Sequence, residues 1–581
     1  MIACLLHLDL GALQASRQAE LLEGAAVLVA RLHQQGVSPS VLLQCSSVAD
    51  AAAGLAALRS AAEAAAAPLS LTQPGQLPVA LRLALDQLAP VVPPAAVAVV
   101  SLADGPGCAA QAAALGCGAG EHLPAGGASA AQLQAWALQA VASLAADRAP
   151  PPRPLLVGYV MKQSRQLALG EQGMLPLLPA APAAQAAAAD AAASKAAMGG
   201  AEAPANGTAA AAAAAEPRLC FVPLDLHSSL APQLARCQLL LQKLTDCLQP
   251  GGGGGVAAPT PEAAALLALL EQQQAQWEVH RQAAAAAGAG TGAPQALPLP
   301  PPPLPLCVVD PPAALAPIMD RALLRDHLEG AAQAVRQRGI PMRAPASVLV
   351  AAFDPAATPR AMAAAAVALP CIAKPQAACG VAEAHQMAFV LHGSAFAGLE
   401  VPLPAVVQEY VDHGGALWKV YCAGEQVFWT QRRSTPDLGP LARLLAEDPA
   451  ADLPTSVGFD SLKSLPTSLP WARQAASTAG AAPGGAAAAA GREAEAPPGH
   501  ELMRQPTFEA VASALRARLG LTLFGFDLVF DRAAGELVIV DVNYFPSFKG
   551  IPEAPAALAT ALRSRYAQHL AATRQLQQRQ G

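Results

Sequence analysis

The chain has 581 residues, of which 53% are hydrophobic and only 4% aromatic, and its formal net charge is −6. Much of the apolar content is alanine, and we find no run of 18 strongly apolar residues, so the sequence predicts no membrane-spanning helix. The negative net charge argues against nucleic-acid binding over a broad surface, although it leaves room for a local basic pocket.

The eleven cysteines are scattered without a CxxC pair, which is typical of reduced core thiols. The first twenty residues contain acids and lack the basic start of a signal peptide. We therefore expect a cytoplasmic protein, with the nucleus as an alternative location, that acts on small molecules and is a monomer.

Residues 1–148 alternate apolar strands with helical segments rich in alanine and leucine, which predicts a separate α/β domain. The candidate strands are 1–10, 37–45 and 96–105, and the candidate helices between them are 25–36 and 48–67. The segment VSLADGPGCAAQAAALGCGAG faintly resembles the last motif of haloacid dehalogenase-like domains. The N-terminal HLDLG carries only Asp9 and no DxD nucleophile motif, so a degenerate, non-catalytic domain is favoured over a phosphatase.

A proline-rich linker at 149–154 precedes a new strand, LLVGYV, and this second region contains four low-complexity stretches. The stretches 179–215, 251–255, 283–305 and 474–499 lack the large apolar side chains of a core, so we expect disordered insertions. Between them, the segments RLCFVPLDL and LPLCVVDPP read as strands. The pattern is dense from Ile318 onward, which places one subdomain at 155–317 and another at 318–570.

Residues 521–550 read as a β-hairpin with strands at 524–530 and 537–543 and turn residues at 531–535. If the turn is centred near Ala534, Asp527 lies directly opposite Asp541, and Asn543 points to the same face. Buried carboxylates need a cation, and all-oxygen ligands favour Mg²⁺ or Mn²⁺ over zinc. The alternative is a solvent-facing hairpin whose acids are unrelated.

Basic residues and a candidate adenine-binding segment come before this hairpin. Lys374 ends the apolar run LPCIAKP, where a lysine is costly unless it meets an anion, and a small flexible loop follows it. The strand AVVQEYVD ends at Gln408–Val411, where backbone groups can meet an adenine edge. Lys419, Arg432, Arg433 and Ser434 follow. Each charge alone is more often a solvated side chain, but a basic pocket beside paired acids is what phosphoryl transfer requires.

Several motifs occur in the order seen in one known family: VGYVMKQSR, LLLQKLTD, VVDPP with MDR, LPCIAKP, QEYVDHGGALWKVY with QRRS, and LFGFDLVF with VIVDVNYFPSF. Over about 155–570 the chain thus resembles the inositol 1,3,4-trisphosphate 5/6-kinase family, also called inositol-tetrakisphosphate 1-kinase, and most of all its plant members. The resemblance implies an α/β protein with an ATP-grasp fold after a Rossmann-like subdomain. Some plant relatives also have a dehalogenase-like N-terminal extension.

The resemblance also implies roles for single residues. The catalytic set would be Lys374, Asp527, Asp541 and Asn543, of which the last three would bind two Mg²⁺ ions. ATP would be held by Arg321, Lys374, Gln408, Glu409, Tyr410, Val411, Lys419 and Ser434. The inositol phosphate would be held by Arg165, Lys243, His385, Lys419, Arg432, Asn543 and Ser547.

The leading hypothesis is therefore an ATP- and Mg²⁺-dependent inositol polyphosphate kinase. One alternative is another ATP-grasp enzyme, a carboxylate–amine ligase that makes an acyl-phosphate. The other is a weakly active or inactive sensor of ATP or inositol phosphates. The full set of Lys374, Asp527, Asp541 and Asn543 argues against the sensor, because a sensor has no need of it.

Overall fold

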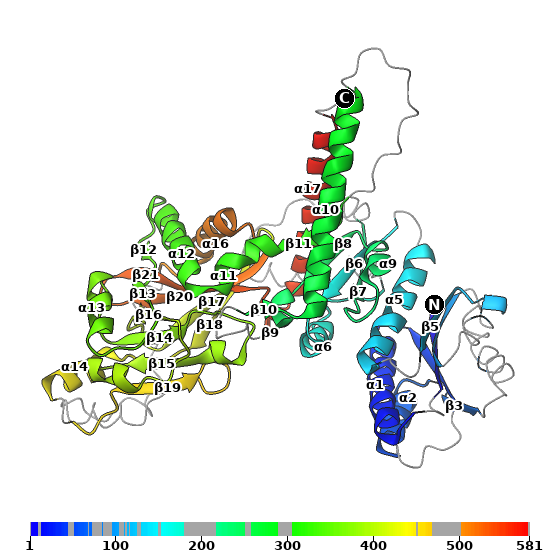
Figure 1. Ribbon diagram of the computed structural model, residues 1–581, viewed down its shortest axis with the longest axis horizontal. Coiled ribbons are helices and arrows are strands. Elements are labelled where there is room, and N and C mark those ends of the chain that lie inside the picture. Colours follow the sequence, from blue (N-terminus) through cyan, green and yellow to red (C-terminus); the bar gives the residue numbers. More distant parts are fainter. Residues whose placement is uncertain are drawn as a thin grey trace. The chain divides into compact units, whose positions relative to one another are not determined.

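The chain divides into two compact units (Figure 1). The first comprises Met1–Lys243, Ala264–Val308 and Leu562–Gly581, and the second comprises Leu244–Ala263 and Val309–Ala561. The computed structural model describes residues 2–9, 13–35, 37–44, 52–67, 69–72, 84, 96–103, 110, 113–115, 117–124, 129–148, 153–178, 217–249, 257–288, 305–448, 451–467 and 501–578. Within these residues, no helix is long and apolar enough to cross a membrane. The boundaries inferred from the sequence stay predictions.

The N-terminal part of the first unit is a parallel five-stranded sheet with the order β3-β2-β1-β4-β5. Strands lie at all three predicted places, and the structure adds β3 and β5, which are short or poor in branched residues. The bounds are β1 Ala3–Asp9, α1 Ala15–Gln34, β2 Ser38–Gln44, α2 Ala52–Ala64, β3 Leu69–Thr72, β4 Val97–Ala103, β5 Ala119–Pro124 and α5 Ala130–Arg148.

A second sheet in the first unit has the order β11-β8-β6-β7, and β6 runs parallel to both of its neighbours. The bounds are β6 Leu155–Val160, α6 Gln163–Glu171, β7 Leu219–Pro223, α9 Leu230–Leu234, β8 Leu239–Gln242, α10 Pro261–Gly288 and β11 Cys307–Val309. Helix α10 corrects one expectation, because it continues to Gly288 into the stretch predicted to lack structure from residue 283. The alanines there have high helix propensity and simply extend the helix. The other predicted insertions, and residues 289–304, lie outside the described residues.

Helix α5 is buried on more than one side. It packs on α1, β4 and β5 and also on β7 of the second sheet. The amide of Gln139, which is 6% exposed, donates to the carbonyl of Pro223 at 2.7 Å and to Oε1 of Gln233 at 2.8 Å. A helix that is apolar nearly all round is one that is covered all round. The two sheets of the first unit therefore share this helix.

The second unit contains two five-stranded sheets. The antiparallel sheet has the order β13-β16-β14-β15-β19, and the other has the order β12-β21-β20-β17-β18. The strand bounds are β9 Leu248–Gln249, β10 Ala258–Pro259, β12 Met342–Arg343, β13 Ser347–Val350, β14 Cys371–Pro375, β15 Gln386–Val390, β16 Ala405–Glu409, β17 Ala416–Ala423, β18 Gln426–Arg433, β19 Ser456–Asp460, β20 Leu523–Asp531 and β21 Glu536–Tyr544. The helices are α11 Ala316–Met319, α12 Arg321–Arg336, α13 Ala357–Ala364, α14 Gly439–Glu447, α16 Gln505–Leu519 and α17 Ala554–Gln578, whose C-terminal part belongs to the first unit.

The predicted hairpin is β20–β21, and its register sets Asp527 opposite Asp541 as expected. The route to this register differs from the prediction, however. Near the turn Leu528 pairs with Ile539, and a β-bulge between the two pairs leaves Val540 as the extra residue. Asp310 anchors the start of β20, because its carboxylate accepts the backbone N–H groups of Thr522 at 2.8 Å and Leu523 at 3.0 Å.

Candidate active site

The candidate site starts from a row of polar residues across three strands of the sheet β12-β21-β20-β17-β18 in the second unit. Asp541 on β21 lies opposite Asp527 on β20, which in turn lies opposite Lys419 on β17. The ammonium group of Lys419 is 3.4 Å from Oδ1 of Asp527. The amide of Asn543 donates to Oδ2 of Asp541 at 3.4 Å. The structure thus brings the predicted metal ligands together and adds Lys419 beside them.

Burial dominates the electrostatics of Asp527, whose side chain is 15% exposed. Burial raises the pKa of this carboxyl group to about 6, and the charge of Asp541 adds to the rise against the opposing effect of Lys419. Oδ1 of Asp527 is buried and finds no hydrogen-bond donor with good geometry among the described residues. The ion pair with Lys419 compensates this buried oxygen only in part, because no aligned hydrogen bond accompanies it, and a buried carboxylate in this position can accept a metal cation as well.

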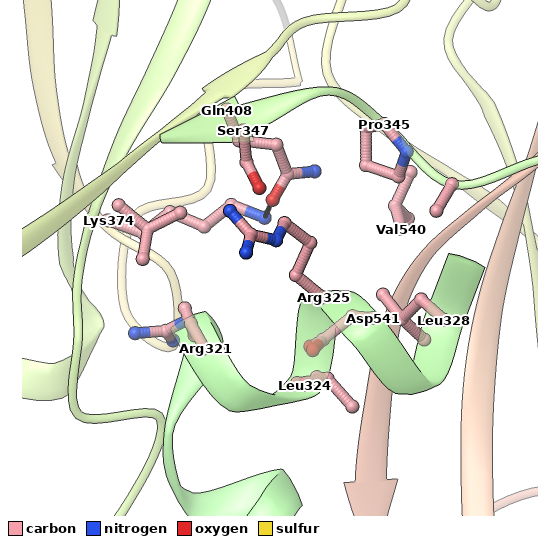
Figure 2. Close-up of a pocket in the computed structure, with 12 residues that line it drawn as sticks. Arg321, Leu324, Arg325, Leu328, Pro345, Ser347, Lys374, Gln408, Val540 and Asp541 are labelled. Carbon is pink, nitrogen blue, oxygen red and sulfur yellow. Dashed lines mark hydrogen bonds between the residues drawn. The ribbon is translucent and has the colours of Figure 1, made fainter. Parts of the chain in front are cut away.

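Lys374, from β14, lines a pocket whose walls come from both sheets and from helix α12 (Figure 2). Its ammonium group donates to Oε1 of Gln408 on β16 at 3.0 Å. Burial lowers the pKa of Lys374 to about 8, while the negative charge of Asp541 works in the opposite direction. A buried lysine that shares its pocket with Asp541 is well placed to meet an anion beside a bound metal.

The predicted adenine segment, Gln408–Val411, ends β16 at the same pocket. Of these four residues, Gln408 is the one that lines the pocket. Tyr410 turns to Thr435, with its hydroxyl 2.7 Å from Oγ1, and Glu409 pairs with Arg343. Within the described residues no acceptor is found for the backbone N–H of Val411. Adenine binding by this segment stays a prediction. Ser434 is buried and donates its N–H to the carbonyl of Gly415 at 2.8 Å.

Arg321 has a different surrounding from the one its predicted role suggested. Its guanidinium donates to the backbone carbonyls of Pro375, Ala377 and Ala384 at 2.6, 2.7 and 3.2 Å. Burial lowers the pKa of Arg321, against the raising effect of Asp541. These contacts hold the small loop after Lys374 in place. Phosphate binding by Arg321 stays a prediction.

The remaining predicted inositol phosphate contacts lie on several different elements. Arg432 on β18 donates to the hydroxyl of Tyr421 at 2.9 Å, and Ser547 is exposed in the loop after β21. Nδ1 of His385 lies 3.2 Å from the hydroxyl of Ser461. Arg165 and Lys243 belong to the first unit, and their roles stay predictions.

Sequence reasoning missed two arginines of the second unit. Arg325 lines the pocket, and its signal was the spacing of four residues from Arg321 on a helix. Arg343 forms ion pairs with Glu409, Asp531 and Glu536 at 2.6, 2.7 and 2.9 Å. No local pattern could have revealed Arg343, because its partners lie far along the chain.

The donor set fits Mg²⁺. Among the described residues, no group of three His, Cys, Asp or Glu side chains forms a metal site, so the candidate ligands are two carboxylates and one amide. All three offer oxygen, which hard cations such as Mg²⁺ prefer. The buried Oδ1 of Asp527 is the observation that supports a cation here.

Comparisons with known proteins agree with this geometry. Residues 340–447 and 485–563 match the family model described as the inositol 1,3,4-trisphosphate 5/6-kinase ATP-grasp domain. Over 401 residues the chain is 27% identical to inositol-tetrakisphosphate 1-kinase 6 of Oryza sativa subsp. indica, a match that covers 68% of this chain and 57% of that protein. Over 255 residues it is 34% identical to inositol-tetrakisphosphate 1-kinase 1 of Zea mays, covering 42% of this chain and 64% of that protein.

The chain thus spans less than two thirds of the length of these two relatives. Among solved structures, it is similar to a RimK domain ATP-grasp protein from Sphaerobacter thermophilus, with 15% identity over 71% of this chain and 99% of that one. The TM-score is 0.30, which is too low to add weight to the family match.

Proposed function

Because the chain belongs to the inositol 1,3,4-trisphosphate 5/6-kinase family through its ATP-grasp domain, we propose that it transfers the γ-phosphate of ATP to a hydroxyl of an inositol tris- or tetrakisphosphate. The observation that carries the proposal is the opposition of Asp527 and Asp541 beside a pocket that contains Lys374. Paired acids and a buried cation are the two parts that phosphoryl transfer needs.

In this proposal each residue has a defined task. Asp527, Asp541 and Asn543 would hold two Mg²⁺ ions, which when bound neutralise the charge on the phosphates. Lys374 would bind phosphate oxygens in place of the amide oxygen of Gln408. The negative charge of the phosphate would keep the lysine protonated. The backbone of Glu409–Val411 would hold the adenine edge. Lys419 and Arg432 would hold phosphates of the inositol substrate.

The residues contribute mainly positioning and charge. No side chain in the pocket has the character of a dedicated general base: its titratable lining residues are Arg321, Arg325, Lys374 and Asp541. Holding the substrate hydroxyl in line with the γ-phosphate can supply a large part of the rate enhancement by itself.

A direct assay tests the proposal. The full chain is incubated with ATP, Mg²⁺ and a panel of inositol phosphates, and the products are separated by anion-exchange chromatography. We expect a product with one more phosphate and a matching amount of ADP. ATP turnover on a carboxylate and amine pair, with no phosphorylated inositol, would instead identify a ligase.

Asp541→Asn separates metal-dependent transfer from background. Because Asp541 lies between Asp527 and Asn543, we expect the variant to lose turnover by at least about a thousandfold, since a phosphate-bridging metal supplies several kcal/mol. Full activity in this variant would show that the hairpin holds no metal.

A further inference from the structure

Arg325 is a pocket residue that the proposed function leaves without a task. It lies on α12 one helical turn after Arg321, on the same face of the helix. Figure 2 shows its guanidinium group pointing into the pocket, toward Lys374 and Gln408. This places a third cation in the pocket, beside Lys374 and Arg321.

The other two cations already have partners inside the protein. Arg321 donates to three backbone carbonyls, and Lys374 donates to Gln408. Nε of Arg325 lies 3.1 Å from a carboxylate oxygen of the neighbouring Asp326, and these side chains are 48% and 75% exposed. An exposed pair of this kind contributes little to stability. Within the described residues, no acceptor is found for the two terminal amino groups of Arg325.

The charge of the pocket also points to an anion. Three cationic side chains line it, and Asp541 is the one acidic residue in the lining. A metal bound at Asp541 would make the pocket still more positive. The terminal amino groups of a guanidinium form a planar fork that matches two phosphate oxygens.

We propose that Arg325 binds the α-phosphate of the nucleotide. The assignment rests on the proposed function, because it takes the Gln408 end of the pocket as the adenine side and the Asp541 end, where the metal would bind, as the side of the terminal phosphates. The guanidinium of Arg325 points toward Gln408 and Lys374 rather than toward Asp541, so the phosphate that it meets is the one nearest the adenosine. Arg325 is thus a nucleotide-binding residue that the family motifs do not mark.

Calorimetric titration of the full chain with AMP, ADP and adenosine tests this assignment. In Arg325→Gln we expect binding of both AMP and ADP to weaken about tenfold or more, because a charge-assisted bond to phosphate is lost. Adenosine binding should stay within about twofold of the original protein, since adenosine has no phosphate. Arg325→Lys should recover part of the loss, because it keeps the charge without the fork.

Asp326→Asn is the matched control. It removes the exposed ion pair with Arg325 while leaving the guanidinium in the pocket. We expect nucleotide affinity in this variant within about twofold of the original. Equal losses in Arg325→Gln and Asp326→Asn, or a loss of adenosine binding in Arg325→Gln, would overturn the proposal.

The outcome is separable from the proposed function. A chain that binds ADP with the expected dependence on Arg325 but phosphorylates no inositol would support this assignment and overturn the kinase. If the original chain phosphorylates inositol phosphates and Arg325→Gln binds nucleotide as tightly as the original, the kinase proposal is supported and the assignment of Arg325 is overturned. Unchanged melting temperatures in the variants would show that the losses do not come from unfolding.

Discussion

At the scale of single residues, Asp527 keeps its negative charge at a cost to stability. Its carboxylate is buried and faces Asp541, and the ion pair with Lys419 offsets only part of this. Burial raises the pKa from 3.8 to about 6. Groups that are arranged to hold a metal commonly carry such a cost when the metal is absent, because ligand charges are gathered together.

We therefore predict that Asp527→Asn stabilises the metal-free protein while abolishing turnover. The pKa of Asp527 is higher in the folded protein than in the unfolded chain. At low pH the carboxyl is protonated in both states and does not destabilise the fold. As the pH rises through about 6, the folded protein must hold the buried carboxylate charged, and its free energy of unfolding falls. At about 1.4 kcal/mol per pKa unit, the variant should gain roughly 3 kcal/mol at pH 7.5.

Thermal unfolding in a chelating buffer at pH 5 and pH 7.5 measures the effect. The gain should be larger at pH 7.5, and added Mg²⁺ with ADP should raise the melting temperature of the original protein more than that of the variant. A variant that is no more stable at pH 7.5 than the original would contradict this account.

At the scale of secondary-structure elements, the sequence predicted the hairpin and its face but not its details. The prediction opposed Asp527 and Asp541 by assuming a turn centred near Ala534, and the structure reaches the same pair through a different turn register combined with a bulge. The bulge at Val540 was not predictable, because nothing local distinguishes this valine from its apolar neighbours Ile539 and Val542. Without the bulge, the observed turn register would have set Val540 opposite Asp527.

Arg343 shows a second limit of sequence reasoning. Its ion pairs join β16, which carries the predicted adenine segment, to both ends of the hairpin turn, at Asp531 and Glu536. Burial alone would lower its pKa, but hydrogen bonds and charges from Glu409 and Asp531 raise it well above the ordinary value. The partners Glu409 and Asp531 are 66 and 188 residues away, so only the fold reveals this link.

Gly525 on β20 lies opposite Asn543 and is required by close packing. An added Cβ would lie 2.8 Å from the carbonyl oxygen of Val420 and 3.3 Å from Pro546. We predict that Gly525→Ala lowers stability by about 1–3 kcal/mol, the usual cost of overpacking, and lowers turnover because the loop that carries Ser547 shifts.

Gly458→Ala is the control for this substitution. Gly458 also lies in a strand, β19, but an added Cβ there would meet no atom within 4 Å. Urea unfolding should show no loss in the control, and a gain of a few tenths of a kcal/mol is expected, because alanine restricts the unfolded chain. Equal stability of the two variants would mean that Gly525 is not held tightly.

At the scale of the whole molecule, helix α5 ties residues 1–148 to the sheet that follows them in the first unit. Helix α5 contacts β4 and β5 of the N-terminal sheet and also contacts β7 of the next sheet. Leu133, Leu138 and Val141 are at most 1% exposed, so little of the helix meets water. The predicted boundary near residue 148 therefore falls between two sheets that share a core element.

We predict that a chain of residues 149–581 is poorly soluble, because it leaves the face of β7 that α5 covers open to water. Supplying residues 1–148 as a separate chain should restore solubility, since the contacts are non-covalent and include the hydrogen bonds of Gln139 with Pro223 and Gln233. Expression of each part alone and of both together, followed by gel filtration, measures this. If residues 149–581 alone are soluble and melt at the same temperature as the full chain, α5 does not stabilise the sheet β11-β8-β6-β7.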